Sequence, residues 1–306
     1  MDKIREAQIS EIKPPKSNYF ITNEIARKIS SLSMTTKVSH IAEKGKETTR
    51  FNIQFVDFDA EGTRVTRPAN ITTFEKVIHD AVISLYKTGN NYITAENIHR
   101  AICGMVNGEA VNPETAKKIH KSILKMQKTH IIIENQILVS NNKKEEEEVK
   151  VDYVGYMLPI EFVKIKTGGA IKGGYHVLNE PVLYTYADAQ SFVRTIKIDF
   201  LQTKSLNNTH DVIVLRDYLI SQYLYLTCGK DNKRKTKRSH NLLYSTIYEK
   251  LEVFKHNLSP DRYKHKTLDI RKKAKAILSD WKEKGLIQNW EEHSEGKSFR
   301  HITLKV

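Results

Sequence analysis

The chain contains little cysteine: only Cys103 and Cys228 occur among its 306 residues. The two cysteines lie far apart in the sequence, and each falls inside or at the end of a predicted helix. Two isolated cysteines exclude a disulfide framework and a cysteine-based zinc finger. Such a pattern is typical of proteins in a reducing compartment.

Long apolar runs are also missing. No stretch approaches 18 consecutive apolar residues, and no N-terminal segment has an apolar core of signal-peptide length. A membrane-spanning helix needs about 20 predominantly apolar residues. We therefore expect a soluble, cytoplasmic protein with no membrane partner.

Motifs of the common enzyme classes are absent. The sequence has no HExxH, no Walker A motif and no GxSxG, and its twelve histidines form no His-x-His pair. The glycine-rich segment Gly168–Gly174 matches no phosphate-binding motif and is expected to be a hairpin loop. Tyr244 and Tyr248 lie one helical turn apart, as nicking tyrosines sometimes do, but no histidine ligand is near them in sequence. We expect these tyrosines to pack beneath a helix, and we expect no catalytic residue, no metal and no cofactor.

Acidic residues are fewer than basic ones, 36 against 50, which gives a formal net charge of +14. The excess is uneven, because residues 205–306 hold 21 Lys and Arg against 12 Asp and Glu, or +9 of the total. A basic balance concentrated in one part of the chain favours a nucleic-acid partner. The length predicts two domains, each large enough to bury its own core.

The most informative segment is the C-terminal one. A basic helix is predicted over roughly 264–284, stopped by Gly285 in the C′ position. A β-hairpin comes next, with a glycine-containing turn at Ser294–Lys297. This order is that of the recognition helix and wing of a winged helix, although a solvated helix packed on a hairpin of an ordinary α+β domain has the same pattern. The stripe that this helix is expected to bury consists of Leu268, Ala274, Ile277, Leu278 and Trp281.

The same order of elements occurs earlier in the chain. A helix with an apolar stripe from Phe74 to Leu85 ends at Gly89, and a second helix begins after Thr94, which can cap it. A third begins at Asn112-Pro113, a good cap followed by proline at the first helical position. A hairpin is then predicted from His130 to Ser140, with its turn at Glu134-Asn135. Two helices with apolar stripes, from Val212 to Leu226 and from Leu243 to Phe254, precede the C-terminal basic helix. Three helices and a hairpin thus recur, which predicts two winged-helix domains in an α+β chain.

The remaining segments complete the predicted organisation. Residues 1–50 have few aromatics and contain Pro14-Pro15, which indicates a flexible arm that could include a docking helix from Ile21 to Leu32. A strand is predicted from Phe51 to Asp59. The expected domains are a flexible N-terminal arm (1–50), a first winged-helix domain (51–140), an acidic hinge with a strand-rich connecting segment (141–204), and a second, more basic winged-helix domain (205–306).

The candidate DNA contacts are derived from the geometry of the major groove, which admits a helix whose side chains reach base edges. Arg271 is the best candidate for a bidentate guanine contact, because its planar fork matches the O6/N7 pair. The loop Lys230–Arg238 is either a phosphate clamp or a flexible basic loop, and the lysines of the third helix are either DNA contacts or a solvated face. The predicted DNA-binding residues are Lys264, Lys266, Thr267, Arg271, Lys272, Lys275, Lys297, Arg300, Lys233, Arg234, Lys235, Lys237, Arg238, Lys117, Lys118 and Lys121.

Two winged helices, the second more basic, resemble the tandem winged-helix replication initiator proteins of plasmids and mobile elements. The resemblance covers roughly 70–306 and rests on the element order, the stripe Phe74–Leu85, the helix start Asn112-Pro113, and the basic helix with its wing. The strand-rich segment 151–200 departs from the simplest form of that plan.

The resemblance implies a sequence-specific double-stranded DNA-binding protein that is not an enzyme. Members of that family bind repeated origin sequences as monomers, and they dimerise through the first domain while repressing their own gene. Origin repeats or a promoter operator, a second copy of the chain, and host replication proteins are therefore the expected partners. A transcriptional repressor, a protein–protein adaptor and a tyrosine-dependent nicking enzyme are the alternatives.

Overall fold

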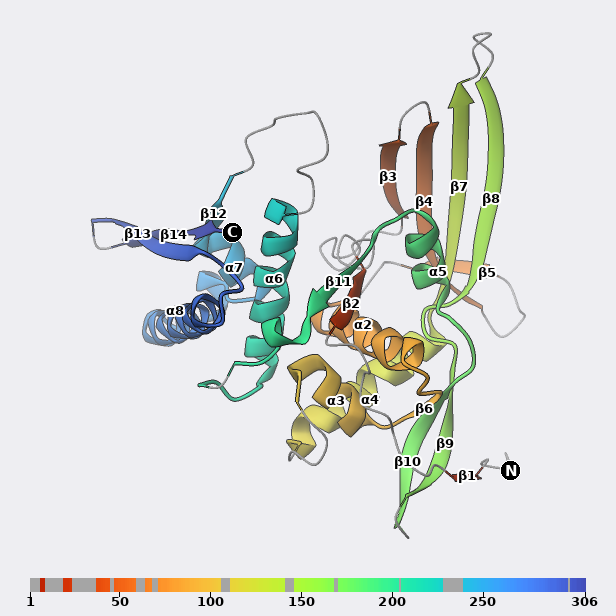
Figure 1. Ribbon diagram of the computed structural model, residues 1–306, viewed down its shortest axis with the longest axis horizontal. Helices are drawn as coiled ribbons and strands as arrows, with labels where there is room; N and C mark the ends of the chain where they lie inside the picture. Colours follow the sequence, from red (N-terminus) through yellow and green to blue (C-terminus); the bar gives the residue numbers. More distant parts are fainter. Residues whose placement is uncertain are drawn as a thin grey trace. The chain divides into compact units, whose positions relative to one another are not determined.

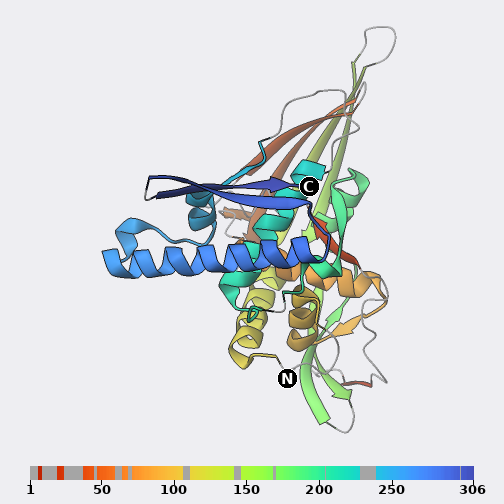
Figure 2. The same ribbon diagram turned by 60° about the vertical axis from the view of Figure 1, so that its left-hand side comes forward.

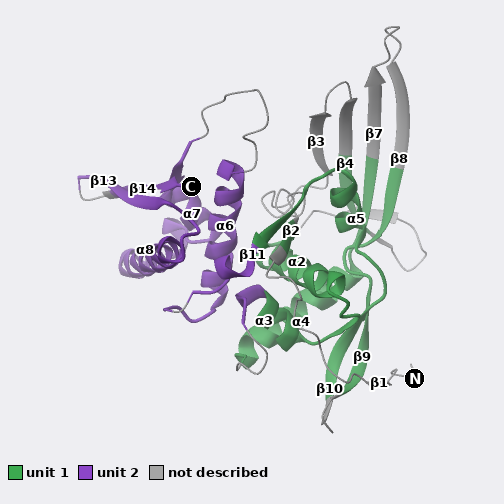
Figure 3. Cartoon of the chain, in the orientation of Figure 1, with its two compact units in different colours: residues 1–101, 106–196 green, residues 102–105, 197–306 purple. Residues whose placement is uncertain are grey.

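The computed structural model describes twelve segments of the chain, which divide into two compact units (Figure 3). The first unit comprises residues 1–101 and 106–196, and the second comprises 102–105 and 197–306. Helices and sheets are mixed in both, as expected for an α+β chain. No described helix is long and apolar enough to cross a bilayer. The described residues are 6–8, 19–23, 37–44, 47–58, 64–67, 71–105, 111–140, 146–167, 170–203, 205–227, 239–296 and 298–306.

A large antiparallel sheet of the first unit has the strand order β3-β4-β7-β8, and β5 pairs with the end of β4. Figure 1 shows β7 and β8 running side by side along this sheet. In β4, Ile53 and Phe55 are buried while Asn52 and Gln54 are partly exposed, so the predicted strand and its alternation are confirmed. The strands are β3 (Lys37–Lys44), β4 (Glu47–Phe58), β5 (Arg64–Arg67), β7 (His130–Ser140) and β8 (Glu146–Tyr156).

Two smaller sheets complete the first unit. One has the order β1-β9-β10-β6, in which β1 is parallel to β9 and the other pairs are antiparallel. In the other, β11 pairs with β2. The strands are β1 (Glu6–Gln8), β2 (Tyr19–Asn23), β6 (Tyr92–Ile93), β9 (Ile160–Thr167), β10 (Ala170–Val177) and β11 (Val193–Lys197).

The three helices predicted between residues 74 and 128 are present, and their starts are set by local capping. Thr72 and Glu75 form a capping box, and the Thr94 hydroxyl accepts a hydrogen bond of 3.2 Å from the Asn97 amide. Asn112 caps the third helix at the Glu114 amide, with Pro113 at the first helical position, as the sequence predicts. A fourth helix, α5, was not predicted. The helices are α2 (Thr73–Lys87), α3 (Ala95–Cys103), α4 (Pro113–Lys128) and α5 (Val182–Ala189).

The described parts of residues 1–50 form strands rather than a flexible arm. Strand β2 packs on α2, where the Ile21 amide donates to the Ser84 hydroxyl at 2.9 Å. Lys76 donates to the Thr22 hydroxyl at 3.0 Å and forms a fully buried ion pair with Asp80 at 2.9 Å. A buried charge requires a partner for each of its polar atoms, and Thr22 of β2 supplies one such partner to Lys76 of the Lys76–Asp80 pair. The strands β1 and β2 were missed because their partners, β9 and β11, lie far along the chain. The proposed docking helix falls mostly outside the described residues.

The hairpin predicted at 130–140 is a single strand instead. Strand β7 runs unbroken through Glu134 and Asn135, which pair with Asn52 and Phe51 of β4 on one side and with β8 on the other. Because both neighbouring strands bind its backbone, two polar residues in mid-strand do not make a turn. The predicted acidic hinge is also shorter than expected, because β8 begins at Glu146 within the glutamate run.

Two hairpins follow α4 in the first unit: β7–β8, which belongs to the large sheet, and then β9–β10. Strand β10 pairs with β6, so Tyr175 lies opposite Ile93. Gly174 is required there, since an added Cβ would lie 2.1 Å from the Ile165 side chain and 2.9 Å from the Ile93 carbonyl oxygen. The predicted loop Gly168–Gly174 is thus mostly strand, with residues 168–169 outside the described part.

The second unit has the predicted order of three helices and a hairpin, with one added short strand. Strand β12 precedes α7 and pairs with β14, giving a sheet of order β12-β14-β13. Figure 2 shows α8 lying along this hairpin. The elements are η1 (Ile198–Phe200), α6 (His210–Thr227), β12 (Asn241–Leu243), α7 (Tyr244–Lys250), η2 (Lys255–Asn257), α8 (Pro260–Glu283), β13 (Asn289–Glu295) and β14 (Ser298–Lys305).

Helix α8 begins before the predicted residue 264, because Ser259 caps it at the Arg262 amide and Pro260 occupies its first position. It ends before Gly285, whose φ of +67° confirms the predicted left-handed stop. Leu268 was expected in the core but is 39% exposed, and Ile270 is buried in its place. Two positions along a helix correspond to a rotation of about 200°, so the two side chains point to nearly opposite sides. The buried stripe is Ile270, Ala274, Ile277, Leu278 and Trp281.

Candidate nucleic-acid interface

The side of α8 opposite its buried stripe is exposed and cationic. Lys264, His265 and Lys272 are exposed there, and neither lysine forms an ion pair with a residue in the described part of the chain. Leu268 lies on the same side of the helix. This side therefore offers cations and one apolar side chain to a partner.

The flank of α8 that faces α6 uses its lysines within the protein. Lys266 donates a hydrogen bond to Asp211 of α6, and Lys273 lies 2.6 Å from Asp269 and 3.9 Å from Asp211. The hydrogen bond with His210, aided by Lys266 and Lys273 and opposed by burial, holds the pKa of Asp211 well below its usual range. Lys266 was predicted to bind DNA, and its ammonium group here joins α8 to α6.

Thr267 is also engaged within α8. Its hydroxyl donates to the carbonyl oxygens of Tyr263 and Lys264, both at 3.0 Å. This is the usual bonding of a threonine inside a helix. A DNA contact by Thr267 remains a prediction that would require its hydroxyl to change partners.

The guanidinium of Arg271 is directed at Glu292 of β13. Its Nε and Nη2 atoms each donate to one carboxylate oxygen of Glu292 at 3.1 Å, and the Arg271 side chain is only 12% exposed. Lys275 lies 2.6 Å from the same carboxylate. The fork that was expected to bind guanine therefore already holds a carboxylate, and a base contact would require this pair to open.

The predicted wing contacts lie at the tip of β13–β14. Arg300 is exposed and forms an ion pair of 2.8 Å with Glu295, and Gly296 has the φ of +58° that the turn requires. Lys297 is outside the described residues. The predicted basic loop also lies outside the described residues. Its predicted DNA contacts are Lys233, Arg234, Lys235, Lys237 and Arg238.

In the first unit, the cationic side of α4 is exposed. Lys118 and Lys121 project from it, and Lys117 forms a surface ion pair of 2.9 Å with Glu114. Lys125 lies 2.9 Å from Glu75 of α2. The predicted lysines are thus solvated, and Lys118 and Lys121 have no ion-pair partner within the described segments.

Strand β9 also exposes cationic residues, which the sequence did not single out. Its exposed side chains are Phe162, Lys164 and Lys166, and they alternate with the buried Val163 and Ile165. The lysines were missed because the hairpin was expected at 130–140. The period-two alternation from 162 to 166 was the available signal.

His120 joins α4 to the hairpin β9–β10. Its Nδ1 lies 2.5 Å from the Tyr175 hydroxyl, and its ring lies edge-on to Phe162, with 5.9 Å between centroids. These contacts join α4 to the hairpin, and we call the exposed sides of α4 and β9 together the α4–β9 surface.

Tyr244, the tyrosine considered as a nucleophile, is only 1% exposed. Its hydroxyl donates to Glu292 at 2.5 Å, and its ring stacks on Tyr248 at 5.9 Å. Burial, then the Glu292 carboxylate, raises the pKa of Tyr244, and burial raises the pKa of Tyr248 to about 12. A nucleophile would need a lowered pKa, so the geometry favours packing for both residues.

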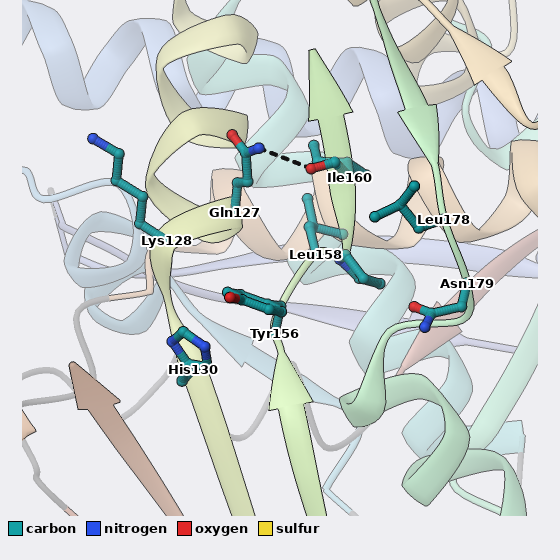
Figure 4. A pocket seen from close by; sticks show the side chains of 9 residues that line it. Gln127, Lys128, His130, Tyr156, Leu158, Ile160, Leu178 and Asn179 are labelled. Carbon is teal, nitrogen blue, oxygen red and sulfur yellow. Dashed lines mark hydrogen bonds between the residues drawn. The ribbon is translucent and has the colours of Figure 1, made fainter. Parts of the chain in front are cut away.

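A pocket of about 760 Å³ lies in the first unit (Figure 4). It is lined by the end of α4, the start of β7 and the connection after β10, and Tyr156 lies over His130 with 3.9 Å between ring centroids. Gln127 closes one side by donating to the Ile160 carbonyl oxygen at 2.8 Å. No residue predicted to bind DNA lines it.

No protein-family model matches the chain, and no curated protein matches it. Two solved structures show a partial likeness, a selenomethionine derivative of domains 2 and 3 of RctB and the RctB domains 2-3. The first has a TM-score of 0.39 and 11% sequence identity over 96% of this chain and 99% of that chain. The second has the same TM-score and identity over 90% and 93%. These values are too low to assign the chain to a family.

Proposed function

We propose that the chain is a sequence-specific double-stranded DNA-binding protein with two winged-helix domains. The observation that carries this is a recurring topology. In each unit the short strand before the second helix pairs with the second strand of a hairpin that follows the third helix, giving the strand runs β6-β10-β9 and β12-β14-β13. In the first unit, β7 and β8 lie between the third helix and this hairpin. The third helix, α4 or α8, precedes that hairpin and has an exposed cationic side.

The exposed side of α8 suits the major groove. Lys264 and Lys272 would bind phosphates or guanine edges, and Leu268 would contact a thymine methyl group. Lys264 and Lys272 form no ion pair among the described residues, so both ammonium groups are available to phosphates. The α4–β9 surface would add phosphate contacts in the same way.

We propose that this DNA-binding chain initiates replication of a plasmid or integrative element, as its resemblance to that family implies. It would bind origin repeats, form a homodimer through the first unit and recruit host replication proteins. A transcriptional repressor would instead bind one promoter palindrome. Sequencing the genomic fragments that the full chain retains distinguishes these roles, because repeated sites beside its own gene support an initiator.

Replacing Lys264 and Lys272 by glutamine should weaken binding to selected and random DNA alike. Each lost phosphate contact lowers the slope of log affinity against log salt by about 1, so we expect the slope to fall by about 2. Fluorescence anisotropy at several salt concentrations measures this. Lys305→Gln is the control, since Lys305 pairs with Glu291 within the hairpin. An unchanged slope in the double variant would place α8 outside the interface.

The α4–β9 surface gives a separate expectation. Replacing Lys164 and Lys166 by glutamine should lower affinity for all DNA and again reduce the salt slope by about 2 if both bind phosphate. Lys87→Gln, a lysine paired with Glu180, serves as the control in the same unit. Wild-type affinity in the β9 variant, measured by the same anisotropy assay, would limit DNA contact to the second unit.

A further inference from the structure

Glu292 is a carboxylate surrounded by donors from two helices. Arg271 and Lys275 of α8 and Tyr244 of α7 all converge on it, at 3.1, 2.6 and 2.5 Å, and its side chain is 11% exposed. An acidic side chain at this position is unexpected on a surface that binds DNA. Because Glu292 is nearly buried and contacts three donors, it is not simply a solvent-exposed charge.

The contacts are of the strong kind. The Arg271–Glu292 pair is bidentate and nearly buried, so removing either partner would leave a charge poorly solvated. Burial would raise the pKa of Glu292, but the hydrogen bonds from Arg271, Lys275 and Tyr244 outweigh it and lower the pKa to about 2. Its folded pKa is depressed, so the pair contributes its full stability above the ordinary value of 4.5 and loses it progressively as pH falls from there to about 2.

The second strand of the hairpin contacts the same arginine. The Phe299 ring of β14 lies with its centroid 3.1 Å from the Arg271 guanidinium carbon. A guanidinium on an aromatic face is an additional attraction. One side chain of α8 is thus held by both strands of the hairpin, by Glu292 on β13 and Phe299 on β14.

The position of Glu292 along β13 adds to this. The pairing of β13 with β14 is regular up to His293 and shifts between His293 and Ser294, where a bulge occurs. A bulge bends its strand and changes the direction of the residues beyond it. The contacts with Arg271 therefore flank the shift, since Glu292 lies before it and Phe299, opposite Ser294, lies beyond it.

We propose that Glu292 is a positioning residue that fixes the wing β13–β14 against α8, and that Arg271 serves in this clamp rather than in reading bases. The clamp is the set Glu292, Arg271, Lys275, Tyr244 and Phe299. It presents the exposed side of α8 and the wing tip to DNA in one arrangement. This role rests on the proposed DNA-binding function, which it deepens.

The neighbouring Glu291 provides a matched control. It lies on the same strand and carries the same charge, but it pairs with Lys305 of β14 at 2.5 Å, and so within the hairpin. Removing a negative charge near DNA raises affinity by electrostatics alone. If Glu292 holds the wing in place, its replacement should instead lower the affinity for the enriched duplex. The direction of the change in affinity therefore distinguishes a positioning role from a purely electrostatic effect.

The experiment compares full-length Glu292→Gln and Glu291→Gln on two probes. One is the duplex most enriched by the wild-type chain from a random-sequence library, and the other is a scrambled duplex of the same composition. Glu291→Gln should bind both slightly more tightly. Glu292→Gln should lose on the order of tenfold on the enriched duplex, while binding the scrambled one at least as tightly as the wild type. Equal behaviour of the two variants would overturn the clamp.

A measurement without DNA keeps the two proposals separate. Amide hydrogen exchange should become faster in β13 and β14 of Glu292→Gln, and stay at the wild-type rate in Glu291→Gln and around Trp281. Arg271→Lys, which keeps the charge but not the fork, should show intermediate exchange. If the wild-type chain selects no duplex, the proposed function fails. The hydrogen-exchange rates of β13 and β14 then still show whether Glu292 holds the hairpin against α8. Wild-type exchange in the Glu292→Gln hairpin would refute the clamp.

Discussion

Replacing Trp281 by alanine is expected to destabilise the second unit by about 3–5 kcal/mol. The indole is fully buried, its Nε1 donates to the Phe200 carbonyl oxygen at 3.1 Å, and its ring packs edge-on against Phe200 with 4.9 Å between centroids. Truncation would remove that packing and leave a buried carbonyl oxygen without its donor. A domain is commonly stable by only about 5–15 kcal/mol, so the loss is a large fraction.

Urea unfolding followed by circular dichroism measures this effect. Trp290→Ala is the control, since Trp290 is only partly buried on β13 and its loss should cost less. Equal costs for the two substitutions would mean that the Trp281 face of α8 does not form the core of the unit.

Raising the salt concentration from about 50 to about 200 mM should reduce the affinity for DNA by on the order of 10³–10⁵. This size of effect is expected for a protein that meets about 6–10 phosphates and displaces their counterions. Each unit would supply its own exposed cations, those of the α4–β9 surface in the first and Lys264, Lys272 and Arg300 in the second. Anisotropy titrations of the full chain on one duplex at fixed pH give the slope.

The salt dependence also distinguishes the alternatives. A protein–protein adaptor would keep its charge for solubility and would bind DNA weakly, with a shallow slope. A nicking enzyme would cleave one strand in the presence of Mg²⁺ or Mn²⁺, and cleavage would vanish with Tyr244→Phe or Tyr248→Phe. A steep slope without cleavage supports the proposed non-enzymatic role.

Arg271 shows how two physical arguments can compete for one side chain. Its position on the basic helix and its planar fork predict guanine binding. Glu292 lies 21 residues further along the chain and has no sequence relation to it, yet it occupies that fork at 3.1 Å. The polar partner that decides the role of Arg271 becomes visible only when β13 is placed against α8.

Most of the helices were determined by the sequence itself, although α5 was not predicted and Ile270, not Leu268, is buried in α8. Their apolar stripes, their caps at Thr94 and Asn112, and the stop at Gly285 are all set by residues within a few positions, because helical hydrogen bonds and caps are local. The same locality made the order of three helices and a hairpin in the second unit predictable.

Only the tertiary structure decided several strands of the first unit and the polar contacts. Glu134 and Asn135 belong to β7 because β4 and β8 lie on either side of them, and residues 19–23 form a strand because α2 and β11 offer it partners. Strand pairing and ion pairs join residues that are distant in sequence, so local composition does not encode them. The pairing of the hairpin β9–β10 with β6 and the contact of Glu292 with Arg271 are both of this distant kind.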